Sequence, residues 1–129
     1  MHRKERILQA HEFLQQYGTV TKEIAFKKSC MLRAEKDAVH GGKAEKWASD
    51  YQDRLYAETE ELIRLRFMIE NAVEKCPCSQ TERQVLYKRY IEGRKWTEIA
   101  SEMLYSVQHL HRLKESALLK LCVPREFKI

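Results

Sequence analysis

The sequence predicts an all-α protein, and three observations support this fold class. Apolar residues recur mainly at intervals of three and four along the chain, the spacing of one face of an α-helix. Only four Gly and two Pro interrupt the 129 residues, so long helices can form. The alternating pattern of half-buried strands is almost absent. We therefore expect a helical N-terminal half with one long helix, followed by a group of shorter helices.

Two amphipathic helices are predicted before residue 37. The first covers residues 3–17, and Gly18 is expected to end it, because Gly is frequent just after a helix. The second covers residues 21–36, with Thr21 as its N-cap. The expected buried residues are Ile7, Ala10, Leu14 and Tyr17 in the first helix and Val20, Ile24, Met31 and Leu32 in the second. A flexible loop is expected over residues 37–43, which contain a Gly pair.

One long helix is predicted over residues 44–75, with a stripe like the seam of a coiled coil. The stripe contains Trp47, Tyr51, Leu55, Glu58, Leu62, Leu65, Ile69, Ala72 and Cys76. Glu58 interrupts this apolar stripe and needs a partner or water. A second, narrower stripe contains Tyr56, Ile63 and Phe67. It favours contact with another helix of this chain or with a second copy, so that a homo-oligomer formed through the long helix is a candidate.

Pro77 marks the predicted domain boundary. Proline cannot continue a helix, and it disfavours helical angles at the residue before it. We expect a helical bundle or coiled-coil-like extension over residues 1–76, a helix-turn-helix unit over residues 79–122 and a tail over residues 123–129. The interval at Pro77 is a hinge rather than a long linker, since a new helix is expected to begin at once.

The net charge is distributed unevenly. The formal total is +5; residues 1–78 hold 14 Lys and Arg against 13 Asp and Glu, whereas residues 79–129 hold 10 against 6. The C-terminal excess would attract phosphate groups. No apolar run approaches the roughly 18 residues needed to span a bilayer, and residues 1–10 lack the apolar core of a signal peptide. We therefore expect a cytoplasmic protein with no membrane partner.

The four cysteines are expected to be reduced thiols, and neither a metal nor another cofactor is expected. Cys76 and Cys78 do not have the Cys-x-x-Cys spacing of a zinc or redox site. A metal shared by Cys76, Cys78 and either Cys122 or His40 is the less favoured alternative, since no second ligand pair has metal spacing. The chain also lacks a Gly-rich phosphate loop and a nucleophile motif, so we expect that it is not an enzyme.

Three short helices are predicted after Pro77. Ser79 and Glu82 form a capping box at the start of the first, and Gly93 is a stop signal after it. The second begins near Trp96, and a tight turn over residues 104–106 leads to the third, with Ser106 as its N-cap. The third helix carries an apolar stripe of Leu110, Leu113, Ala117 and Leu121.

This order of helices is typical of a helix-turn-helix, whose last helix enters the major groove of DNA with its first turns. Gln can pair with adenine, Arg with guanine, and a Val side chain can contact a thymine methyl group. The candidate base-reading residues are therefore Val107, Gln108, His111 and Arg112, and the N-cap Ser106 is a further candidate DNA contact. The candidate phosphate contacts are Arg94, Lys95 and Lys114, with Arg83, Lys88 and Arg89 as further cations. Double-stranded DNA is the predicted partner.

Residues 81–121 resemble region 4 of sigma-70-type transcription factors, the part that reads the −35 promoter element. The matching segments are Thr81-Glu82-Arg83-Gln84-Val85-Leu86, Arg89-Tyr90-Ile91-Glu92-Gly93, Trp96-Thr97-Glu98-Ile99-Ala100 and Ala117-Leu118-Leu119-Lys120-Leu121. The whole chain is similar to small phage regulators such as the ArpU/RinA-type late transcription regulators. The resemblance implies RNA polymerase as a further candidate partner. Leu104 departs from the family, which usually has Gly or another turn former there, and Lys95 stands where Ser or Thr is usual.

These observations favour a sequence-specific DNA-binding transcription regulator, phage or prophage encoded. A first alternative is a DNA-packaging or scaffold protein that oligomerises through the long helix. A second is a module that binds polymerase without DNA specificity. Oligomeric state and salt-dependent DNA affinity would distinguish the three.

Overall fold

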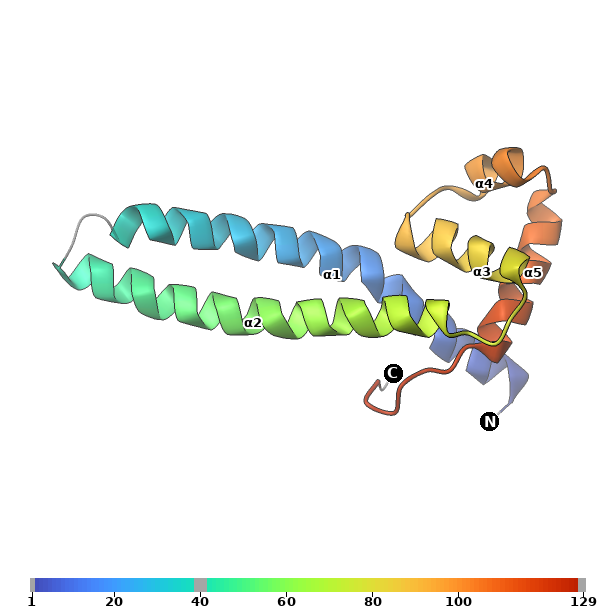
Figure 1. Ribbon diagram of the computed structural model, residues 1–129, viewed down its shortest axis with the longest axis horizontal. Helices are drawn as coiled ribbons and strands as arrows, with labels where there is room; N and C mark the ends of the chain where they lie inside the picture. The colour runs from blue at the N-terminus through green and yellow to red at the C-terminus, as the bar shows by residue number, and fades with distance from the viewer. Residues whose placement is uncertain (1, 39–41, 128–129) are drawn as a thin grey trace. The chain divides into compact units, whose positions relative to one another are not determined.

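The computed structural model describes residues 2–38 and 42–127, with the side chains of residues 42–44 left out (Figure 1). These ranges are helical for most of their length and contain no strand, which confirms the all-α class. In chain order the elements are α1 (Arg3–Ala38), α2 (Gly42–Glu74), α3 (Gln80–Leu86), the π-helical turn η1 (Tyr87–Ile91), α4 (Trp96–Met103) and α5 (Val107–Lys120). None of the described helices is long and apolar enough to cross a membrane.

The first two predicted helices are one helix, so the predicted break at Gly18 is wrong. A Gly inside a helix costs about 1 kcal/mol relative to Ala. Leu14 before it, and Val20 and Ile24 after it, are all buried, and burial of such side chains stabilises by more than that cost. Leu32 was also predicted to be buried but is exposed.

The long helix is confirmed, but its predicted stripe is only partly correct. The buried residues of α2 are Ala48, Leu55, Thr59, Ile69 and Val73, whereas Trp47 is exposed. Repeated steps of four residues from Trp47 overshoot the 3.6-residue period, so the predicted stripe drifts away from the buried face. The buried face also includes small residues, which a stripe chosen by large apolar residues leaves out. Thr59 can lie there because its hydroxyl donates to the carbonyl of Leu55 at 2.6 Å.

Part of the segment predicted as a loop, residues 37–43, is helical. The end of α1 includes Asp37 and Ala38, and α2 begins at Gly42. The remaining positions of the predicted loop, residues 39–41, lie outside the described residues.

Contacts divide the chain into two units. Unit 1 contains Met1–Gly18 and Met68–Ile129, and unit 2 contains Thr19–Phe67. The sequence-based division at Pro77 differs from this grouping, because about the first four turns of α1 are grouped with the C-terminal helices.

Unit 2 is an antiparallel pair made by parts of α1 and α2 (Figure 1). Gln52 donates to the carbonyl of Met31 at 3.1 Å, and Lys27 donates to the carboxylate of Glu58 at 2.5 Å. The predicted need of Glu58 for a partner is therefore met by Lys27 on the other helix.

Unit 1 is held together by α1 at its N-terminal end. Phe13 and Leu14 are fully buried, and the guanidinium of Arg6 donates to the carbonyl of Leu119 at 3.0 Å. The imidazole Nδ1 of His11 and the hydroxyl of Tyr90 lie 2.7 Å apart. Burial raises the pKa of Tyr90 to about 12, so this hydroxyl keeps its proton at neutral pH. These contacts tie α1 to both η1 and α5.

Candidate nucleic-acid interface

Helices α4 and α5 are joined by a tight turn whose backbone is unusual. Leu104 has a φ of 59° and lies in the left-handed region. The next amide, of Tyr105, donates to the carbonyl of Ala100 at 3.2 Å. Leu104 therefore takes the backbone conformation that favours Gly, and its side chain is 88 % exposed. An L-residue costs about 1 kcal/mol or more in this conformation, whereas Gly, which has no Cβ, does not.

Replacing Leu104 with Gly is expected to raise the free energy of unfolding by about 0.5–1 kcal/mol. Gly removes the left-handed strain, and the gain exceeds the extra flexibility of the unfolded chain by a small margin. Urea unfolding followed by circular dichroism would measure the change. Leu104→Ala is the matched control, since it removes the exposed side chain but keeps a Cβ at positive φ. Equal stability of the Gly and Ala variants would contradict the strain at this position.

The first turn of α5 is fixed by a cap and by one buried leucine. The Ser106 hydroxyl accepts a hydrogen bond from the amide of His109 at 3.0 Å, as expected for the predicted N-cap. Leu110 is fully buried in a cluster with Val85 and Ile99. The partly buried residues around this cluster are Trp96, Ala100, Met103 and Leu113. The rotation of α5 about its axis is therefore set by its apolar side.

Gln108 and Arg112 are exposed on the other side of α5. They are four residues apart, so they lie on one face of the helix. Neither has a hydrogen bond or ion pair to other described residues. Val107 and His111 are half-buried beside this face. The structure thus brings the four predicted base-reading residues to the first turns of α5, with Ser106 used as the cap.

Trp96 organises a cluster of cationic and aromatic side chains next to this face, which the sequence pattern did not single out. The His111 ring lies 4.8 Å from the Trp96 ring, centroid to centroid. The Arg89 guanidinium and the Lys114 ammonium lie 5.0 and 5.6 Å from the indole centroid. Both cations are attracted to the face of the ring. Lys114 is therefore positioned by Trp96 rather than freely extended into solvent.

Arg94 is held by carboxylates. Its guanidinium forms ion pairs with Glu92 and Glu102, and Lys88 donates to the same Glu102 carboxylate at 2.5 Å. Hydrogen bonds from Lys88 and Arg94 lower the pKa of Glu102, and the hydrogen bond to Glu102 raises the pKa of Arg94. Lys95, in contrast, has an exposed side chain with no ion pair to the described residues. Among these cations, Lys95 is the one most available for a phosphate.

Scans of protein-family models, curated proteins and solved structures found no match to this chain.

Glu82 anchors the start of α3 to the end of α5. It is only 6 % exposed. Its carboxylate accepts from the Lys120 ammonium at 3.0 and 3.3 Å and from the Ser79 amide at 3.2 Å. Burial alone would raise the pKa of Glu82, but hydrogen bonds from Ser116, Lys120 and Ser79 outweigh it and lower the pKa to about 2. The predicted capping box is confirmed, and it extends into an ion pair that the sequence did not show.

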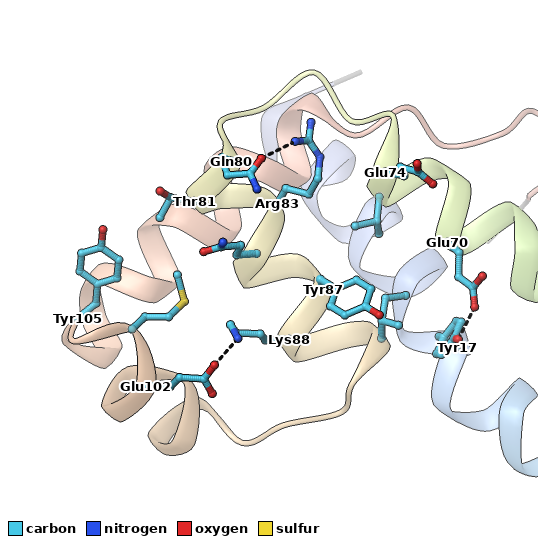
Figure 2. Close-up of a pocket in the computed structure, with 14 residues that line it drawn as sticks. Tyr17, Glu70, Glu74, Gln80, Thr81, Arg83, Tyr87, Lys88, Glu102 and Tyr105 are labelled. Carbon is cyan, nitrogen blue, oxygen red and sulfur yellow. Dashed lines mark hydrogen bonds and ion pairs between the residues drawn. The ribbon is translucent and has the colours of Figure 1, made fainter.

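A groove of about 770 Å³ lies on another part of unit 1 (Figure 2). Figure 2 shows the hydroxyl of Tyr17 directed at Glu70, and Lys88 at Glu102. Glu74 adds a third carboxylate to the lining. None of the eight predicted DNA-binding residues lines this groove, although the further cations Arg83 and Lys88 do. Three carboxylates against these two cations leave no positive excess in the lining to attract a nucleic-acid backbone.

The cysteines are not arranged as a metal site in the described residues, where no group of three or more His, Cys, Asp or Glu could hold a metal ion. His40, named in the alternative metal set, lies outside those residues. Cys76 is buried, and burial with a hydrogen bond to Cys78 raises the pKa of its thiol to about 12. A thiol with such a pKa is a poor ligand and nucleophile at neutral pH.

Proposed function

We propose that this protein is a sequence-specific DNA-binding transcription regulator in which α4, the turn at Leu104 and α5 act as a helix-turn-helix. The observation that carries the proposal is the pair Gln108 and Arg112. Both are exposed and unpaired on the first turns of α5, while Leu110 anchors the opposite side. In a helix-turn-helix the first turns of the second helix contact the base edges.

The chemistry of this face suits base edges in the major groove. The amide of Gln108 can pair with adenine, and the guanidinium of Arg112 can donate two hydrogen bonds to guanine. The Val107 side chain beside them can make an apolar contact with the methyl group of thymine. Glu115 follows on the same exposed side and would repel a phosphate, so the contact with DNA would end near Arg112.

The cations around this face suit the DNA backbone. Lys95 is free to reach a phosphate, and Lys114 is positioned by Trp96 close to α5. Arg94 would first have to leave Glu102, so we assign it a smaller share of the binding. The resemblance to sigma-70 region 4 extends the proposal to a phage or prophage regulator that also contacts RNA polymerase.

Selection of bound sequences from a random DNA pool at about 150 mM salt tests the proposal. At this ionic strength much of the non-specific phosphate attraction is screened, so an enriched motif would require base contacts. We expect a motif containing adenine and guanine within one major-groove segment. Recovery of no motif would contradict sequence-specific reading and would favour a packaging, scaffold or polymerase-binding role.

Arg112→Ala is expected to weaken binding to the selected site by about 5- to 150-fold, because one bidentate base contact contributes about 1–3 kcal/mol. Specificity should relax at one base pair only. Fluorescence anisotropy with the selected site and its single-base variants would measure both effects. Lys95→Ala removes the same charge and is the matched control. It should weaken selected and unselected DNA alike and reduce the salt dependence by about one counterion.

Unchanged affinity of a folded Arg112→Ala variant for its selected site would rule out the assigned reading face. Circular dichroism of both variants would establish that the helices are retained. An equal loss on all DNA sequences would instead make Arg112 a phosphate contact.

A further inference from the structure

Unit 2 leaves several large aromatic side chains outside its small core. Its buried residues are Val20, Ile24, Ala34, Ala48, Leu55 and Thr59. By contrast, Phe26 is 64 %, Trp47 67 % and Tyr51 37 % exposed. These three side chains are neighbours, because all of them line one groove of about 840 Å³ between the α1 and α2 segments. We call this surface the aromatic groove.

We infer that the aromatic groove is an interface at which two copies of this chain associate. Two packed helices bury only one seam, and a stable arrangement of amphipathic helices covers the remaining apolar surface with further helices. A second helix pair placed on the groove would give four packed helices. The inference does not depend on DNA binding.

The shape of the groove fits a second copy. A two-fold interface uses the same patch on both chains, so the patch must contain both a projection and a hollow. Trp47 provides the projection. The buried small residues Ala34 and Ala48 also line the groove and provide the hollow. Each copy can therefore insert its Trp47 beside the small residues of the other.

The charge of the groove also fits a second copy. Its described lining contains one cation, Arg33, and one anion, Asp37. A two-fold rotation can place each Arg33 opposite the Asp37 of the other chain, so that two identical surfaces meet without net repulsion. A groove adapted to DNA or to a strongly acidic or basic partner would carry an excess of one sign.

The exposed aromatic area alone is below the roughly 1,000 Å² of a stable interface, so a dimer formed here would be weak. A fully exposed aromatic side chain presents about 150–250 Å², so Phe26, Trp47 and Tyr51 leave on the order of 400 Å² uncovered per copy. Two copies would bury on the order of 800 Å² of aromatic surface. This is about half of the roughly 1,600 Å² in a standard interface, and the polar lining residues would add to it. We expect a dissociation constant in the micromolar range.

Sedimentation equilibrium of the full chain in reducing buffer tests the inference. The reductant prevents cross-linking through Cys30, which lines the groove, and through the exposed Cys122. At about 100 µM, well above the expected dissociation constant, the apparent mass of the wild type should be twice the 15.4 kDa of one chain. Trp47→Lys and Phe26→Lys should each sediment as monomers with unchanged circular dichroism, since both side chains are exposed.

Tyr56→Lys is the matched control. Tyr56 is 62 % exposed, does not line the groove and lies about 140° around α2 from Tyr51, so this variant should remain dimeric. Arg33→Asp should raise the dissociation constant several-fold, and Arg33→Asp combined with Asp37→Arg should restore much of the affinity. A wild type that stays at 15.4 kDa overturns the inference and leaves the groove to a different protein. Loss of the dimer in Tyr56→Lys but not in Trp47→Lys overturns it as well, and assigns association to the opposite face.

Discussion

Acidification from pH 5 to pH 2 is expected to remove about 3 kcal/mol of stability that depends on Glu82. Its pKa is about 2 in the folded chain, against 4.5 without these contacts. A carboxylate with a lowered folded-state pKa stabilises the fold above its unfolded pKa, and the effect is lost as pH falls through the folded value. The window therefore runs from about pH 4.5 down to 2. Each unit of difference between the folded and unfolded pKa corresponds to about 1.4 kcal/mol of stability.

The variant Glu82→Gln isolates this effect. The amide can still accept the hydrogen bond from Ser79, but it cannot form the ion pair with Lys120. It should be less stable than the wild type at neutral pH, and the difference should shrink towards pH 2. Urea unfolding of both proteins at several pH values would measure the difference. The comparison with the variant is needed because hydrogen bonds also lower the pKa values of Glu58 and Glu102, so these carboxylates contribute to the pH dependence of the wild type as well. A difference that stays constant between pH 5 and 2 would refute the role of the ionised carboxylate.

The contrast between Gly18 and Gly93 explains which helix ends could be predicted from the sequence. Gly93 has a φ of 68° and follows the end of η1. The amide of Arg94 after it donates to the carbonyl of Lys88 at 3.1 Å. The helix stop that Gly93 predicts in the sequence is therefore present in the local backbone. Gly18 carries the same local signal, yet α1 passes through it. Burial of residues on both sides decides the outcome there, and burial depends on helices that are distant in sequence.

The candidate site shows the same limit. The capping residues Ser79 and Ser106 could be predicted, because a cap acts on its own helix. The partners of Lys114 and Arg94 could not, since a cation pattern does not show that Trp96 lies beside one of these cations and Glu102 beside the other. The exposed face of α5 was predictable from periodicity, whereas the faces of α1 and α2 were predicted only in part, as the exposed Leu32 and Trp47 show. The freedom of each charge on such a face requires the structure.

Leu110→Ala is expected to have the largest effect of any single substitution considered, lowering the free energy of unfolding by about 2–5 kcal/mol. Leu110 is fully buried against Val85 and Ile99, and a cavity adds its own cost to the lost burial when the surroundings cannot collapse. Collapse is restricted here because Ser106 caps the first turn of α5 and Glu82 holds its last turn through Lys120.

The matched control for this cavity is Leu32→Ala, since Leu32 is 61 % exposed in a helix. It should change the free energy of unfolding by less than about 0.5 kcal/mol. Denaturant unfolding of the full chain would compare the two variants, and equal losses would contradict the packing of α5. Because the same leucine sets the direction of Gln108 and Arg112, Leu110→Ala should also weaken binding to the selected DNA under conditions where the variant is still helical. Retained full affinity in that state would show that the reading face does not depend on this anchor.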